Sequence, residues 1–526
     1  MDKPVNFLFI VTDQQRADHL GCYGNPVVRT PHIDRLAQEG FRAGRCYVAS
    51  PICQPNRASI MTGRMPSVHG VRHNGIELDF GQTTFVEVLR EAGYRTALVG
   101  KSHLQNITDV AAHWPVDARE RLAREARTQA PGRHGQEQAT AWEADPGFEM
   151  SLPYYGFEKV ALSINHGDNQ FGHYRRWLRA QCADADKLVG PANAIPTPEF
   201  ELSRSRQAWR TRVPEELYPT RWVTDQTIAS MREFATSGKP FFIQCSYPDP
   251  HHPFSPPGKY WDMYSPEDMP LPKSFHARHM NLPPAVRWLR EQRDAGKAVK
   301  HSPALFACSE REAREAAALN YGSISAIDDG VGRLMRELEA QGIADNTVVI
   351  FTSDHGEYMG DHQLMLKGPV HYQGVIRVPF VWRDPQGQVG TSSRSLIQST
   401  DLAPSVLARA GLPAFNGIQG HDLGGLINGS KPEVRADLLI EEEGQRVYMG
   451  FPQRIRMRSF LDARHRMSLY EGVPWGELYD LENDPDELVN LWDDPASRTL
   501  RADMTEAMAR HFIAQSDTSP YPESLA

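Results

Sequence analysis

The most distinctive residues in this chain form a short run that begins at Cys53 and continues through Pro55 and Arg57. With six cysteines and 39 prolines in 526 residues, Cys-x-Pro-x-Arg is expected by chance in only about 0.05 of such chains. Requiring Gly63, ten residues after the cysteine, lowers this figure to roughly 0.004. A lone cysteine is most often a buried structural thiol, but this spacing indicates a cysteine with a chemical function.

Charged and imidazole side chains follow four segments that are typical of buried β-strands, at 6–12, 94–99, 240–245 and 346–352. Ligands of open α/β sheets bind beyond the carboxyl ends of the strands. We therefore expect one edge of the sheet to collect Asp13 and Gln14, Lys101 and His103, His251 and His252, and Asp354 and His355. Cys53 joins them if residues 55–64 form a helix, because proline favours a helix start and a helix N-terminus attracts an oxyanion.

Four of these residues have the donor atoms of a divalent metal site. Asp13 and Asp354 offer carboxylates, Gln14 an amide oxygen and His355 an imidazole. Such a set of ligands leaves coordination positions open for the oxygen of a nucleophile and for an oxygen of the substrate. A nitrogen donor admits Mn²⁺ as readily as Ca²⁺. The sequence therefore predicts one divalent cation, either Ca²⁺ or Mn²⁺.

The run from Cys53 to Arg64 resembles the signature of the formylglycine-dependent sulfatases, which departs here only at Asn56, where many members have Ser or Ala. In that family the cysteine is oxidised after synthesis to an aldehyde, formylglycine, so the resemblance implies a maturation enzyme as a partner. One oxygen of the hydrated aldehyde attacks sulfur or phosphorus, and the second later expels the bound oxyanion.

The resemblance also implies roles for the other residues. Metal ligands are expected at Asp13, Gln14, Asp354 and His355, although the better-known calcium sulfatases have Asp and Asn where this chain has Gln14 and His355. Arg57 and His103 are expected to hold the diol hydroxyl. The remaining cationic or polar candidates are expected to face the sulfate and the leaving group: Lys101, His251, Lys367 and, beside the substrate, Asn74. His252 has no family counterpart and is interpreted as packing or rim.

Sulfatase-like motifs extend over most of the chain, from Thr30-Pro31-His32 to Asp484-Pro485. The resemblance and the alternation of strands with helical patterns at 31–39, 85–92, 222–236, 310–341 and 401–410 predict an alkaline phosphatase-like α/β fold with a mostly parallel sheet. Residues 1–425 are predicted to form the catalytic domain, with 106–220 as loops that cover the substrate. Residues 426–526 alternate like antiparallel strands and predict a small second domain with a tail at 516–526.

Composition excludes several other functions. A net charge of −9 and a pI near 6.1 argue against a nucleic-acid or anionic-membrane surface. We see no signal peptide and no stretch long enough to cross a membrane. The spacing of the six cysteines does not suggest a disulfide framework, which predicts reduced thiols and a cytoplasmic protein.

The polar tail at 516–526 is interpreted as either disordered or an arm that contacts another subunit, so a homo-oligomer is expected.

These observations predict an arylsulfatase-like hydrolase of small sulfate monoesters. The alternative within the class is a phosphonate monoester or phosphodiester hydrolase that uses the same aldehyde and metal. That branch carries other residue types where this chain has Lys101 and His103, which favours sulfate with promiscuity toward phosphoesters. A rival from another class is a non-catalytic anion-binding protein in which Cys53 is never oxidised.

Overall fold

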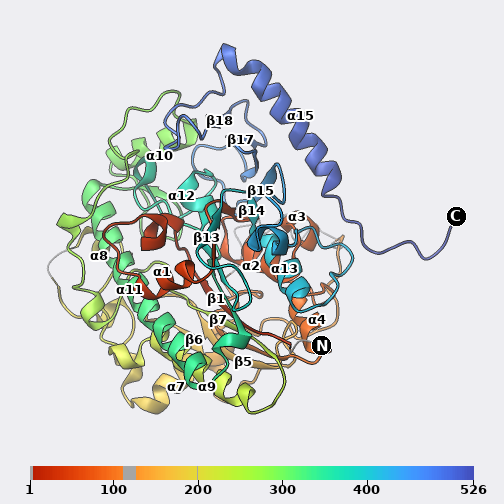
Figure 1. The fold of residues 1–526 in the computed structure, drawn as a ribbon. Helices are drawn as coiled ribbons and strands as arrows, with labels where there is room; N and C mark the ends of the chain where they lie inside the picture. Colours follow the sequence, from red (N-terminus) through yellow and green to blue (C-terminus); the bar gives the residue numbers. More distant parts are fainter. Residues whose placement is uncertain (1–3, 111–125, 198–199, 526) are drawn as a thin grey trace.

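The computed structural model describes residues 4–110, 126–197 and 200–525, and its centre is a nine-stranded sheet (Figure 1). The order across the sheet is β13 (Thr391–Ser393), β2 (Phe41–Ala43), β12 (Phe380–Arg383), β9 (Thr347–Ser353), β1 (Asn6–Thr12), β7 (Phe241–Ser246), β4 (Arg95–Gly100), β5 (Lys159–Ile164) and β6 (Phe171–Gly172). The five strands from β9 to β5 are mutually parallel. Their carboxyl ends therefore meet at one edge.

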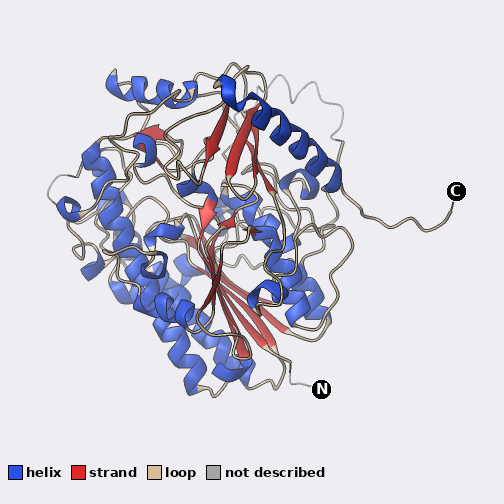
Figure 2. Ribbon diagram, turned by 45° about the horizontal axis from the view of Figure 1, so that its top comes forward, coloured by secondary structure: helices blue, strands red, loops and turns tan. Residues whose placement is uncertain are grey.

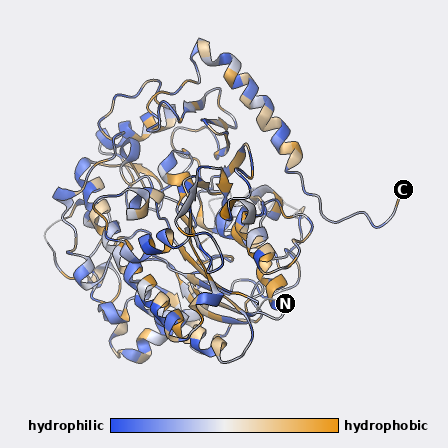
Figure 3. Cartoon of the chain, in the orientation of Figure 1, coloured by the Kyte–Doolittle hydropathy of each residue, from blue (hydrophilic) through white to orange (hydrophobic). Residues whose placement is uncertain are grey.

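Both faces of the sheet are covered by helices (Figure 2). Along β1, Leu8 and Ile10 pack into one core, whereas Phe7, Phe9 and Val11 pack into the other. The first face carries α1 (Pro31–Gln38), α9 (Pro219–Ala235) and α11 (Glu310–Ala340), and the second carries α2 (Cys53–Thr62), α4 (Phe85–Glu91) and α13 (Leu402–Arg409). Apolar side chains on both faces explain why the central strands are continuous apolar runs. Figure 3 shows the same concentration of hydrophobic residues on the central strands.

Most predicted elements lie within a few residues of their observed bounds, and β12 is a further strand of the central sheet. β12 pairs antiparallel with β9, so its carboxyl end points away from the shared edge. The other α-helices that precede α15 in the described residues are α3 (Pro66–His69), α6 (Ala139–Ala144), α7 (His173–Gln181), α8 (Glu201–Arg204), α10 (Pro284–Asp294), α12 (Gln373–Ile376) and α14 (Gly424–Ile427). Two small sheets are formed by β10 (Leu364–Met365) with β8 (Phe306–Ala307), and by β11 (Arg377–Val378), β3 (Cys46–Tyr47) and β14 (Ile397–Gln398).

The segment 106–220 is more than a set of loops, which corrects the prediction. It supplies β5 and β6 to the sheet and the amphipathic helix α7, while its residues 111–125 lie outside the described residues. β5 was missed because only its second half is fully buried, which makes its apolar run short. The segment therefore places the residues after β5 at the same edge as those after β1, β4, β7 and β9.

The C-terminal part contains an antiparallel sheet, as expected, and this sheet has four strands. Its strands are β15 (Leu438–Glu443), β16 (Arg456–Leu461), β17 (His465–Tyr470) and β18 (Gly476–Asp480), and β18 was not anticipated. α15 (Arg498–Ala514) lies outside this sheet, and the tail runs away from it at the periphery (Figure 1). Ala49 and Met65 of the larger part pack into the core of this sheet. In the described part of the chain, no helix has both the length and the apolar character of a membrane span.

Candidate active site

Five parallel strands, rather than the four expected, deliver polar side chains to the shared edge. Asp13 and Gln14 follow β1, Lys101 and His103 follow β4, His251 and His252 follow β7, and Asp354 and His355 follow β9. The fifth contribution is His166, two residues after β5, which the sequence analysis missed. The signal that could have revealed it is the apolar stretch 160–164 directly before an Asn-His pair.

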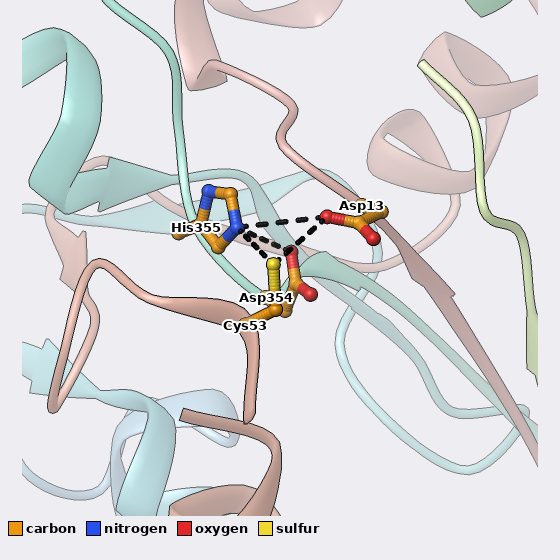
Figure 4. A group of neighbouring side chains, drawn as sticks. All are labelled: Asp13, Cys53, Asp354 and His355. Atoms are coloured by element: carbon orange, nitrogen blue, oxygen red, sulfur yellow. Dashed lines mark hydrogen bonds and ion pairs between the residues drawn. The ribbon is translucent and has the colours of Figure 1, made fainter. Parts of the chain in front are cut away.

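Asp13, Cys53, Asp354 and His355 form a buried cluster (Figure 4), and their ligand atoms all lie within 4.8 Å of one another. His355 Nε2 lies 3.5 Å from Asp13 Oδ1, 3.7 Å from Asp354 Oδ1 and 2.9 Å from Cys53 Sγ. The Cys53 sulfur is 3.6 Å from Asp13 Oδ1. Two carboxylates, an imidazole and a side chain at position 53 therefore converge on one point, and this donor set fits a divalent cation.

The protonation state of His355 suits it to bind a metal. Its Nδ1 lies 2.9 Å from the carbonyl oxygen of Gly356, so the ring hydrogen is assigned to Nδ1 and Nε2 presents its lone pair to the cluster. Burial lowers the pKa of His355 to about 4, although the charges of Asp354 and Asp13 oppose this effect. The ring is therefore neutral at physiological pH.

The carboxylate of Asp13 is held ionised by its neighbours. Burial alone raises the pKa of a carboxyl group, but the charge of Lys101 outweighs that effect and keeps the pKa of Asp13 well below its ordinary value. Lys101 Nζ donates a hydrogen bond to Asp13 Oδ2. Asp13 is thus an ionised carboxylate in a region without solvent contact.

Helix α2 places Cys53 and Arg57 on one side of the site. Cys53 is the first residue of the helix and Arg57 lies one turn later, so both face the same direction. The helix begins two residues earlier than expected, so Pro55 is its third residue, where a backbone N–H has no intrahelical partner in any case. Arg57 Nε donates to Asp354 Oδ2 at 2.7 Å, and Arg57 Nη1 donates to the Lys101 carbonyl at 3.0 Å. Asn56, the departure from the family signature, donates to the Asp354 carbonyl.

Two lysines lie on either side of Asp13 and Gln14. Lys101 Nζ contacts Asp13 and lies 2.7 Å from His166 Nε2. Lys367 Nζ donates to Gln14 Oε1 at 2.6 Å and lies 2.8 Å from His251 Nε2. The structure therefore brings both predicted lysines into the buried cluster, although Lys367 comes from a segment more than 110 residues distant from His251.

Two buried nitrogen atoms beside the cluster have no hydrogen-bond partner among the described residues. They are Nη2 of Arg57 and Nδ1 of His103, which belong to the two residues expected to hold a hydroxyl at position 53. His103 also has a positive φ of 58°, as Gln14 has one of 62°. Such backbone strain in residues other than glycine concentrates at functional sites. Unpaired donors and acceptors here fit an additional oxygen on residue 53.

The structure gives Gln14, Asn74 and His252 contacts that differ from their predicted roles. The Gln14 side-chain oxygen accepts from Lys367, and its nitrogen contacts Glu357 and His252 Nδ1, so this side chain links Lys367 to the metal loop. Asn74 Oδ1 accepts from the backbone N–H of Gln54 at 3.2 Å and so caps the start of α2. His252 is not a rim residue, because it is buried and stacks on His251 with ring centroids 4.1 Å apart.

A wide groove of about 1410 Å³ lies elsewhere, between the loop after β1 and the C-terminal sheet, and is lined by Arg16, Arg42, Arg377 and Arg394 among others. It contains none of the residues of the buried cluster. The cluster is the candidate active site because the predicted nucleophile, metal donors and cations converge there.

A mostly parallel sheet, helices on both faces and a polar cluster at the carboxyl edge define an α/β protein of alkaline phosphatase-like architecture. The sulfatase family profile matches residues 5–412, and the profile of the N-sulphoglucosamine sulphohydrolase C-terminal region matches residues 360–513. The chain therefore belongs to the sulfatase family and is a sulfuric ester hydrolase.

Individual relatives are similar to this chain over nearly its whole length. An arylsulfatase of Clostridium perfringens (strain 13 / Type A) is 27% identical over 498 residues, which cover 92% of this chain and 90% of the relative. The multifunctional alkaline phosphatase superfamily protein PehA of Trinickia caryophylli is 28% identical over 538 residues, with coverage of 97% and 96%. The solved phosphonate monoester hydrolase of Agrobacterium radiobacter superposes with a TM-score of 0.75 at 25% identity, with coverage of 98% and 97%.

Proposed function

We propose that this protein hydrolyses sulfate monoesters of the arylsulfatase type, with residue 53 as the nucleophile in the form of formylglycine and with one divalent cation beside it. The observation that carries the proposal is the position of Cys53, which begins a buried helix and lies against two carboxylates and an imidazole. The family match and the arylsulfatase relative support the same substrate class.

The charges of the site suit a sulfate group. Arg57, Lys101 and Lys367 provide three cations, against the carboxylates of Asp13 and Asp354. Burial raises the pKa of the nearby Glu357 and so favours its neutral form more than in a free carboxyl group. A divalent cation would add to this positive excess, and fixed cations in a buried site stabilise charge on the oxygens of a transition state.

Unmodified Cys53 is poorly suited to act as the nucleophile. Burial, together with the charge of Asp13, raises the pKa of its thiol to about 11, although Lys101 and Lys367 oppose the shift. A protonated thiol is a weak nucleophile at neutral pH. Conversion to formylglycine would supply a hydrated aldehyde with two oxygens on one carbon.

Each remaining residue has a task that follows from its contacts. Asp13, Asp354 and His355 would hold the cation, which supplies polarisation of bound oxygen atoms. Arg57 and His103 would bind a hydroxyl on residue 53 through their unpaired nitrogens. His251 accepts from Lys367 at Nε2, so this pair can transfer or hold a proton on the leaving-group side.

The test combines mass spectrometry with kinetics. Peptide mass spectrometry determines whether Cys53 carries the aldehyde, and a panel of aryl sulfates and phosphoesters determines the preferred substrate. We expect aldehyde-bearing protein to turn over aryl sulfates. Aldehyde-bearing, metal-loaded protein without activity on any sulfate ester would contradict the proposal.

Phosphonate monoester hydrolysis is the second candidate. It is favoured by the structural similarity to the Agrobacterium radiobacter enzyme and by the multifunctional relative PehA. Lys101 and His103 decide between the two, because the phosphonate branch is expected to carry other residue types at these positions. Both side chains are present and buried at the cluster. We therefore expect sulfate esters to be preferred, with promiscuous activity toward phosphoesters.

Replacement of Lys101 or His103 by alanine should therefore reduce sulfate hydrolysis more than phosphonate hydrolysis. Each residue should contribute on the order of 3 kcal/mol to the sulfate reaction, comparable to one oxyanion-hole donor, which corresponds to roughly a hundredfold loss in kcat/KM. The measurement is kcat/KM for an aryl sulfate and a phenyl phosphonate. Lys159→Ala is the control, since this residue forms a surface ion pair with Glu233. Equal losses on both substrates would show that the two residues do not select the substrate.

A further inference from the structure

His166 is a largely buried group at the site for which the sequence analysis found no role. It lies in the segment 106–220, directly after β5, and its side chain is only 13% exposed. Its Nε2 is 2.7 Å from Lys101 Nζ and 3.4 Å from Asp13 Oδ2. Its ring stacks on that of His251 with centroids 3.6 Å apart and planes inclined by 12°.

The two lysines of the site have matching surroundings. Lys101 donates to an oxygen of Asp13 and contacts His166 Nε2, whereas Lys367 donates to an oxygen of Gln14 and contacts His251 Nε2. The two imidazoles that accept from the lysines are the stacked pair. His166 therefore has the same relation to Lys101 that the expected catalytic His251 has to Lys367.

This contact defines how His166 is protonated. An ammonium group has three donors and no acceptor, so Nε2 of His166 must present a lone pair to Lys101 and carry its hydrogen on Nδ1. Burial and the charge of Lys101 lower the pKa of His166 to about 4, in agreement with a neutral ring. Asp13 and His166 together engage two of the three N–H bonds of Lys101, which leaves one for an anionic ligand.

We propose that His166 is a positioning residue of the anion site, which holds the Lys101 ammonium in place through Nε2 and aligns it with His251 through the stacked rings. The inference rests on the proposed function, because the anion is taken to be the sulfate group of the substrate. It assigns a specific task to the segment 106–220, which supplies a side chain that orients a catalytic lysine.

A different use of the same atoms is a second metal site, because ligand atoms of Asp13, His166 and His251 also lie within 4.8 Å of one another. The structure favours positioning, because the Lys101 ammonium already bonds to two of these three residues. Metal analysis of the purified protein separates the two. The proposal expects the same metal content in the wild type and in His166→Phe, and two ions in the wild type with one lost in His166→Phe would overturn it.

Two substitutions separate positioning from simple packing. His166→Phe keeps a ring that can stack on His251 but removes the hydrogen-bond acceptor. His166→Gln removes the ring but can place an amide oxygen near the position that Nε2 of His166 has in the wild type. We expect kcat/KM for an aryl sulfate to fall about 30-fold in His166→Phe and less than about fivefold in His166→Gln. A residue that only packs would show the reverse order, and that result would overturn the proposal.

A double-mutant cycle tests whether His166 acts through Lys101. If it does, His166→Phe should cause little further loss in a Lys101→Met background. Independent, additive losses would contradict the proposal. His173→Gln is the matched control, because His173 is a partly buried histidine of the same segment whose Nδ1 accepts from the backbone N–H of Leu162 and not from Lys101.

Binding of inorganic sulfate to the Cys53→Ala protein, measured by calorimetry, provides a readout that does not depend on turnover. We expect the affinity to fall about tenfold in Cys53→Ala combined with His166→Phe, and to be largely retained with His166→Gln. Unchanged sulfate affinity in the His166→Phe combination would overturn the positioning role. Wild-type protein that binds sulfate but hydrolyses no sulfate ester would instead contradict the proposed function alone.

Discussion

Replacement of Cys53 by serine is expected to abolish repeated turnover and lower kcat for an aryl sulfate by at least about a thousandfold, as loss of a catalytic nucleophile does in other enzymes. The serine oxygen is placed at the start of α2, close to Asp13 and His355, as the sulfur is. It can therefore still attack sulfur. The resulting serine ester has no second oxygen on the same carbon to expel the sulfate, so the enzyme should be trapped.

The measurement is a rapid-mixing experiment with a chromogenic aryl sulfate, followed by intact-mass analysis. Cys53→Ser should release at most one equivalent of phenol per chain and then carry the mass of a sulfate group. Cys182→Ser, at a half-buried free cysteine outside the cluster, should have unchanged activity. Wild-type turnover in Cys53→Ser would exclude a mechanism that needs two oxygens on residue 53.

The central strands could be predicted from the sequence because both of their faces are buried. β1 and β9 are continuous apolar runs whose side chains alternate between the two cores, and the polar residues after them lie where parallel strands must end. Asp13, Lys101, His251 and Asp354 were therefore found without any knowledge of their contacts. Helix α2 was different, because every one of its residues is buried and polar residues occur all around it. Its prediction depended on Pro55, which favours a helix start, and on the resemblance to the sulfatase signature.

The side-chain arrangement could not be predicted from the sequence. The pairs Lys367 with His251 and Lys101 with His166 join residues 116 and 65 positions apart, and no local pattern encodes such contacts. His252 was interpreted as packing or rim because it has no family counterpart, and its stacking on His251 could not be predicted because it depends on how the loop after β7 packs. His166 was missed because β5 lies near the edge of the sheet and only Leu162, Ser163 and Ile164 of it are fully buried. The contribution of segment 106–220 therefore required the folded chain.

The second large effect is expected at the metal cluster. Asp354→Asn should remove the bound divalent cation and lower activity by at least about a thousandfold, because the cluster loses one of its two anionic ligands. Asparagine has nearly the same volume and its oxygen can still accept from the backbone N–H of Gln14, as Asp354 Oδ1 does at 3.1 Å. The fold should persist, although Arg57 loses its buried partner at 2.7 Å, at a cost of about 3–5 kcal/mol.

Metal content by elemental analysis, kcat/KM and thermal unfolding should be measured on the same preparations. Asp328→Asn is the matched control, since Asp328 is also a buried carboxyl group but accepts from the backbone of Ile33 at the start of α1. It should retain both metal and activity. Reconstitution of metal-stripped wild type with Ca²⁺ or Mn²⁺ then identifies the ion that the nitrogen donor of His355 selects. Asp354 forms an ion pair with Arg57. If the Asp354→Asn protein retained one metal ion per chain, the carboxylate of Asp354 would serve mainly to hold Arg57, and the cation would be bound by other residues.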